Sequence, residues 1–168
     1  MICFKMTTSL LHIIRADLRR PHPYAHERVG FLGAGLSLTH SHCTLLAHSY
    51  QNVPDTEYLK DPSVGAMLGP DAMFKAVAWA HETKLALFHI HVHGGMGIPR
   101  FSGVDLREAK KFVPDFFKFC PECPHGTIVL SNDAAFGHVW LNKQDGPRTV
   151  GKFSIIGPRI ESWRVPHE

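Results

Sequence analysis

The chain has 168 residues, a length typical of one domain with a sizeable buried core. Its 44% hydrophobic and 20% charged residues and formal net charge of +3 indicate a globular protein. The basic residues form no run, so the sequence predicts neither a nucleic-acid partner nor a membrane surface. The opening Met1–Met6 stretch is too short and too interrupted for a secretory signal, and with four cysteines this favours a reducing, cytoplasmic compartment.

The first elements are the hardest to assign, because the apolar residues after Thr8 mix helical and strand spacing. We expect a short strand and then a helical piece that reaches Arg20. Residues 1–8 stay open as a disordered segment or a mis-assigned start, since Met6 can equally begin the chain.

Two strands are predicted next. The first opens with Glu27 and carries glycines as far as Gly35, and glycines inside a strand often mark a close approach of other groups to the backbone. The second runs from Cys43 to Val53, where threonine, leucine and tyrosine suit a pleated surface. The turn-rich residues 52–69 are then expected to form a loop.

A helix and a strand follow this loop. The helix begins at Pro70 and ends near Lys84, with apolar residues at the 3.6-residue spacing. From Leu85 to His93 two sets of residues alternate, which predicts a strand that is buried on one face and polar at its C-terminal end.

Ser102-Gly103-Val104-Asp105 has the form of a capping box and predicts the start of a helix that continues to Pro114. Asp115–Cys120 is expected to be a short helical or irregular aromatic segment. Further strands are predicted at residues 126–131, 138–141, 152–156 and 159–165. The mixture indicates an α+β fold in which helices flank a mixed β-sheet.

The stretch from His89 to Asp105 carries the candidate chemistry. Histidines two residues apart on a strand face the same side, so a pair of them can share one metal ion. Three protein ligands and a water are usual for catalytic zinc, which lowers the pKa of that water to about 7. A second carboxylate is needed to accept the proton of the water, and Glu27 is the obvious candidate.

These residues resemble a known family. Glu27 and the following Arg28-Val29-Gly30-Phe31-Leu32-Gly33 resemble the opening of the JAB/MPN domain. The His-x-His and Ser-x-x-Asp elements resemble its JAMM metalloprotease motif, and Ser102–Asp105 is particularly similar to the version in the proteasome-lid deubiquitinase. The compact size resembles the prokaryotic branch. The resemblance implies a single MPN/JAB-like domain over residues 1–168, with a central curved mixed β-sheet flanked by helices.

The resemblance also implies an activity. It implies that His91, His93 and Asp105 bind Zn2+, that Glu27 is the general base, and that Ser102 helps to stabilise the oxyanion. The implied reaction is hydrolysis of the peptide or isopeptide bond after the C-terminal tail of a ubiquitin-like protein. The implied partners are that substrate and the activating and conjugating enzymes of its pathway, in a setting such as antiviral defence.

The histidine register is open. The family usually has ten residues between the second histidine and the aspartate, whereas eleven separate His93 from Asp105 and thirteen separate His91 from Asp105. One extra residue in a glycine-rich loop is easier to absorb than three, so we prefer His91 and His93 to His89 and His91. Gly94 also replaces the proline that commonly follows the second histidine, and His89 is then a candidate supporting residue.

Other residues and other functions compete with this assignment. Cys120 and Cys123 form a lone CxxC motif, which is half a zinc site, so two reduced thiols are the better prediction. His40 and His42 lack a nearby acid and are expected to be loop residues. The alternative functions are a non-catalytic MPN scaffold in a protein complex and a zinc hydrolase of small amino-acid conjugates.

Overall fold

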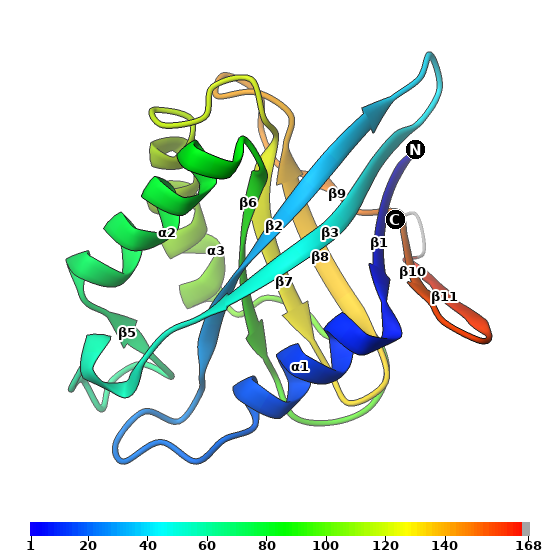
Figure 1. The fold of residues 1–168 in the computed structure, drawn as a ribbon. Helices are drawn as coiled ribbons and strands as arrows, with labels where there is room; N and C mark the ends of the chain where they lie inside the picture. Colours follow the sequence, from blue (N-terminus) through cyan, green and yellow to red (C-terminus); the bar gives the residue numbers. More distant parts are fainter. Residues whose placement is uncertain (166–168) are drawn as a thin grey trace.

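One mixed β-sheet forms the centre of the computed structural model, which describes residues 1–165 (Figure 1). Its nine strands are β1 (Ile2–Thr7), β2 (Val29–Leu38), β3 (Cys43–Asn52), β6 (Ala86–Val92), β7 (His125–Leu130), β8 (Ala135–Trp140), β9 (Arg148–Thr149), β10 (Lys152–Ile156) and β11 (Ile160–Arg164). Across the sheet their order is β11-β10-β1-β3-β2-β6-β7-β8-β9. Parallel and antiparallel pairs alternate irregularly, so the predicted mixed α+β fold is confirmed.

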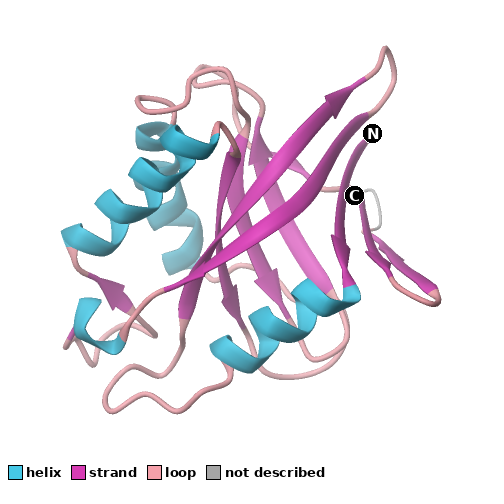
Figure 2. Ribbon diagram, in the orientation of Figure 1, coloured by secondary structure: helices cyan, strands magenta, loops and turns pink. Residues whose placement is uncertain are grey.

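Helices cover the two faces of this sheet (Figure 2). They are α1 (Thr8–Leu18), α2 (Pro70–Thr83) and α3 (Gly103–Phe116). Helix α1 closes one apolar cluster, which includes Phe4, Ile14, Leu32, Leu45 and Phe88. Helices α2 and α3 close a second cluster on the other face, which includes Phe31, Ala76, Leu87, Val113 and Phe116. None of the helices within residues 1–165 is long and apolar enough to cross a membrane.

Strand β6 divides its residues between these two clusters, because successive side chains of a strand point to opposite faces. Phe88 and Ile90 belong to the cluster under α1, whereas Leu87 belongs to the cluster under α2 and α3. His89 and His91 share the parity of Leu87. The histidines of β6 therefore lie on the face that α2 and α3 cover, next to the start of α3.

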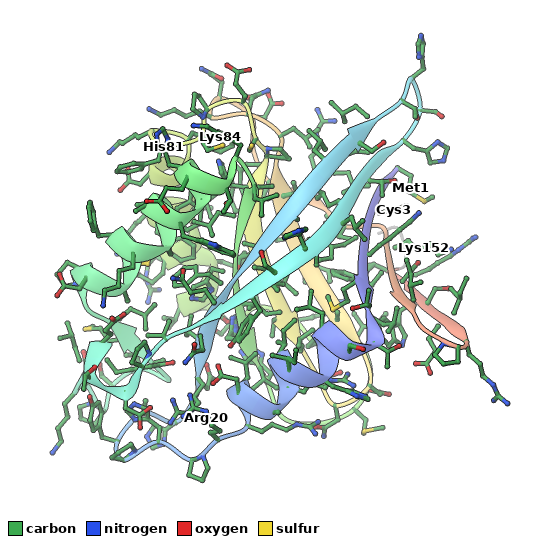
Figure 3. All side chains as sticks on the ribbon, viewed as in Figure 1. Met1, Cys3, Arg20, His81, Lys84 and Lys152 are labelled. Carbon is green, nitrogen blue, oxygen red and sulfur yellow. The ribbon has the colours of Figure 1, made fainter. Side chains whose placement is uncertain are left out.

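The beginning of the chain corrects one expectation. Residues 1–8 are not disordered: Ile2–Thr7 is the parallel partner of both β3 and β10, and Figure 3 labels Met1 and Cys3 beside Lys152. Phe4 and Met6 are buried, and the Thr7 side chain caps α1 by accepting from the Leu10 N–H at 3.2 Å. The apolar run is too short to show a periodicity. It forms a strand because it pairs with two strands that are distant in the sequence.

Helix boundaries differ slightly from the prediction. Helix α1 ends at Leu18 rather than at Arg20. Helix α2 ends where predicted, with Lys84 in the left-handed conformation at φ 54°. Helix α3 continues two residues beyond Pro114, so this proline lies in the last turn instead of ending the helix.

The predicted loop 52–69 contains three short elements. A 3-10 turn, η1 (Asp55–Glu57), leads into β4 (Tyr58–Leu59), and β5 (Met67–Leu68) pairs with β4 to make a two-stranded ribbon. The Tyr58 hydroxyl accepts from the Val29 N–H at 2.8 Å and joins this ribbon to the start of β2. The loop is therefore attached to the strand that follows Glu27.

One glycine of β2 confirms the expected close approach. A Cβ atom at Gly30 would lie 2.2 Å from the hydroxyl oxygen of Tyr50. That hydroxyl donates to Asp17 of α1 at 2.5 Å, and burial raises its pKa far above the ordinary value. Only glycine leaves room for this contact across β2 and β3.

Candidate metal centre

The end of β6 brings two histidines together. His91 and His93 lie on the same face, and their Nε2 atoms are 3.2 Å apart. His93 follows the last strand residue, and its N–H donates to the carbonyl of Leu130 at 2.8 Å, which extends the pairing with β7. His91 is almost fully enclosed, whereas the His93 side chain is 24% exposed. The pair therefore forms the inner wall of an open site.

The N-terminus of α3 supplies a carboxylate to the same site. Ser102 and Asp105 form the predicted capping box: the Asp105 N–H donates to Ser102 Oγ at 3.1 Å, and Asp105 Oδ2 accepts from the Ser102 N–H at 2.7 Å. In this orientation Asp105 Oδ1 lies 3.5 Å from His91 Nε2, and Oδ2 lies 3.5 Å from His93 Nε2. The capping interactions thus place the Asp105 carboxylate beside both imidazoles.

Glu27 reaches the site through the register of β2 against β6. The two strands are antiparallel with Val29 opposite His91, and continuing this register by two residues places Glu27 opposite His93. Glu27 Oε1 lies 3.9 Å from His93 Nε2. Ligand atoms of Glu27, His91 and His93 all lie within 4.8 Å of one another. Sheet pairing thus brings together residues that are far apart in the sequence.

The ligand atoms of Glu27, His91 and His93 are close enough together to hold a metal ion. Bonds of about 2.0–2.2 Å in a tetrahedral arrangement separate two donors by about 3.3–3.6 Å. His91 Nε2 and His93 Nε2 are 3.2 Å apart, and each lies 3.5 Å from a different Asp105 oxygen, Oδ1 for His91 and Oδ2 for His93. Glu27 is 3.9 Å from its nearest imidazole, so its carboxylate lies at the margin of this set. Three close donors and one more distant carboxylate describe the geometry.

The charge state of Asp105 suits a ligand. Burial by itself raises the pKa of this carboxyl, but the interactions with His91 and with the Ser102 hydroxyl and N–H outweigh burial. The pKa of Asp105 therefore lies well below its usual range. The carboxylate is therefore ionised near neutral pH, the form that binds a cation.

The structure pairs His91 with His93 and leaves His89 outside the group. The ring of His89 packs against Phe112 and Phe31, with centroids 4.9 and 5.9 Å away. Its Nδ1 has no hydrogen-bond partner within residues 1–165, and burial lowers its pKa, so it stays neutral. His89 supports the site by packing under it rather than by orienting a ligand through Nδ1.

The glycine-rich loop after His93 contains two glycines with positive φ. Gly95 and Gly97 adopt φ values of +96° and +83°, which residues with a side chain rarely tolerate. The Gly97 N–H donates to Asp133 Oδ1 at 2.7 Å, and the Ser131 hydroxyl donates to the Gly97 carbonyl at 2.7 Å. Ser131 and Asp133 carry no recognisable motif in the sequence; their only signal there is a cluster of turn-forming residues after a strand.

A groove of about 600 Å³ leads to the histidines. One wall is the segment Ser63–Leu68, and the other is α3 with Arg107, Glu108 and Lys111 at its rim. Apolar side chains line much of the space between the walls: Val29, Val64, Met67, Met73 and Phe112. A groove of this volume can take a small conjugate or a short polypeptide segment.

The remaining sequence candidates do not join this site. Cys120 and Cys123 are free, with their Sγ atoms 2.9 Å apart, and burial raises the pKa of Cys123 to about 12. Cys123 lies against the carbonyl of Lys84, at the end of α2. His125 makes hydrogen bonds to the Leu87 N–H and the Cys120 carbonyl, so both its ring nitrogens are occupied.

No protein-family model and no curated protein matches this sequence. Among solved structures, the chain is similar to the N-terminal domain of STIL from Trichoplax adhaerens, with a TM-score of 0.37 and 12% sequence identity. The similarity covers 79% of this chain and 39% of that one, so the chain spans about two fifths of that structure. A likeness at this level carries no argument about family or function.

Proposed function

We propose that the protein is a JAMM-type zinc peptidase of the JAB/MPN family that cleaves after the C-terminal tail of a ubiquitin-like protein. The observation that carries the proposal is the convergence of three segments of the chain: the end of β6 with His91 and His93, α3 with Asp105, and the segment before β2 with Glu27. Neutral imidazoles and a carboxylate in an open arrangement are a donor set of catalytic zinc.

The proposed roles follow from position. A bound zinc ion would act as a Lewis acid on the scissile carbonyl and acidify the attacking water. His91, His93 and Asp105 would hold the ion. The Glu27 carboxylate, 3.9 Å from His93, takes a proton from the attacking water and gives it to the leaving amine nitrogen as the C–N bond breaks. The reaction thus adds one water across the peptide bond and returns Glu27 to its ionised form.

Ser102 can serve both roles that the sequence left open. Its Oγ accepts from the Asp105 N–H, which uses a lone pair of the hydroxyl. The O–H hydrogen remains available to donate to an oxyanion, and Ser102 lines the groove. One serine can therefore cap the helix, hold Asp105 and stabilise charge on the substrate.

The groove supports an extended polypeptide as the substrate. β5 pairs with β4 along one edge only among the described residues, and it lies in the wall of the groove. An extended tail beside this edge would gain backbone hydrogen bonds. The proposal includes a cytoplasmic location, which agrees with four free cysteines, and activating and conjugating enzymes of the same pathway as further partners.

The test uses a ubiquitin-like protein fused through its C-terminal tail to a reporter. Cleavage by the wild type, loss of cleavage in Glu27→Ala, and about one zinc per chain in both proteins are expected. A metal-free wild type that cleaves nothing would favour the MPN scaffold instead. Hydrolysis of small amino-acid conjugates without cleavage of any fusion would favour the small-molecule hydrolase.

A further inference from the structure

Residues 61–66 form a loop that holds the backbone of Glu27. The carbonyl oxygen of Gly65 accepts two hydrogen bonds from consecutive residues, the His26 N–H at 2.8 Å and the Glu27 N–H at 3.0 Å. Glu27 precedes β2 and has no strand partner of its own. The Gly65 carbonyl therefore replaces the pairing that a neighbouring strand would supply.

The Cα of Gly65 also limits the Glu27 side chain. A Cβ atom at position 65 would lie 2.7 Å from both the Cδ and Oε2 atoms of Glu27, closer than real Cβ contacts. Gly95 and Gly97 are the only described glycines with a positive φ, so the backbone of Gly65 does not itself require glycine. A side chain at position 65 would therefore displace the Glu27 carboxylate.

The loop is itself anchored. Asp61 Oδ1 accepts from the Ser63 N–H at 2.9 Å and from the Ser63 hydroxyl at 2.6 Å, which shapes the turn before Gly65. After Gly65, β5 pairs with β4, and the hydroxyl of Tyr58 in β4 bonds to Val29 at the start of β2. Gly65 and Glu27 are thus both attached to the same end of β2.

From these contacts we infer that Gly65 is a positioning residue for Glu27. Its carbonyl fixes the backbone of Glu27, and its missing side chain leaves the space in which the carboxylate lies beside His93. The inference rests on the proposed function for the catalytic consequence, but the contact between the two residues can be tested without any substrate.

The first experiment is a double-mutant cycle on thermal unfolding of the full chain as purified. Gly65→Ala is expected to lower Tm by about 2–4 °C, since a new methyl group meets the Glu27 carboxylate. In a Glu27→Ala background the same change is expected to cost nothing, because the atoms that it meets are gone. The control is Gly35→Ala in β2, where a new Cβ has no neighbour within 4 Å.

The second experiment measures cleavage of the fusion substrate and zinc affinity by chelator competition. Gly65→Ala is expected to lower kcat about 100-fold, while KM and zinc affinity stay within about twofold, because a displacement near 1 Å is costly in an active site. In a Glu27→Gln background Gly65→Ala should lower kcat no further. Gly35→Ala should keep the wild-type kcat.

Two results would overturn the inference. An equal loss of Tm in both backgrounds would mean that the methyl group meets something other than Glu27. An unchanged kcat in Gly65→Ala, in a wild type that cleaves the fusion, would mean that the loop does not place the carboxylate. If the wild type cleaves nothing, the proposed function fails, and the thermal cycle alone still decides whether Gly65 holds Glu27.

Discussion

The two halves of the candidate site are built in different ways. Asp105 is held by a capping box whose partner, Ser102, is three residues away, so a short sequence is enough to orient it. Glu27 is held by the register of β2 against β6 and by the carbonyl of Gly65, which are distant in the sequence. The half of the site that contains Asp105, here called the helix-borne half, is therefore fixed by local interactions. The half that contains Glu27, the strand-borne half, depends on contacts between distant parts of the chain.

The sharpest way to separate the two halves is to remove only the proton carrier. Glu27→Gln is expected to lower kcat by about 10²–10⁴, the range for a general base, while zinc content stays at about one per chain. Steady-state cleavage of the fusion and metal analysis check both numbers. Glu122→Gln, which changes an exposed acid beside Cys123, is the matched control. Loss of zinc in Glu27→Gln would make this carboxylate a ligand instead.

Removing the helix-borne carboxylate should give the opposite pattern. Asp105→Ala is expected to weaken zinc binding by at least about 100-fold, because even a supporting residue of a metal site costs 10–100-fold. Chelator competition measures this loss. Asp115→Ala, an exposed acid near the other end of α3 that pairs with Lys118 at 2.6 Å, should bind zinc like the wild type. Full zinc affinity in Asp105→Ala would contradict the assignment.

The pH dependence of stability tests a histidine of the core, His125, which lies outside the candidate site. Burial lowers the pKa of His125 to about 4, against about 6.5 in the unfolded chain. The unfolded chain therefore binds the proton first, and the free energy of unfolding should fall by about 2 kcal/mol between pH 7 and pH 5. Urea unfolding at both values measures this, and His125→Gln should remove that part of the slope.

The smallest effect concerns the cap alone. Ser102→Ala is expected to lower the free energy of unfolding by about 1 kcal/mol, because the Asp105 N–H loses its partner. Ser102→Thr keeps a hydroxyl and should retain the wild-type stability. Urea unfolding compares the three proteins. If Ser102→Ala were as stable as the wild type, the local half of the site would not depend on its capping box.

The local features were the ones that could be predicted from the sequence. The capping box, the strand before His93 and the helix that ends near Lys84 depend on neighbours within a few residues, and the structure has all three. The prediction that this strand is buried on one face only was wrong, because helices cover both faces of β6. The mixed fold followed from the order of these elements. The strand Ile2–Thr7 could not be predicted with the same certainty, because two strands that are distant in the sequence hold it in the sheet.

The rest of the site required information that no local pattern contains. The placement of Glu27 beside His93 depends on which strand pairs with β2 and in which register, and only the family resemblance suggested it. Gly65 and Asp133 lay in segments whose composition predicts turns. Composition does not tell which backbone group of a turn will bond to which distant residue.

The position of β1 has a consequence for how the chain reaches its native state. β1 lies between β3 and β10, and its pairing with β10 joins Cys3 to Lys152. During synthesis β1 and β3 can meet early, but the second edge of β1 stays open until β10 has been synthesised. Such non-local pairing slows folding and exposes a strand edge meanwhile. A nascent chain that stops before β10 would be expected to aggregate rather than to keep a partial fold.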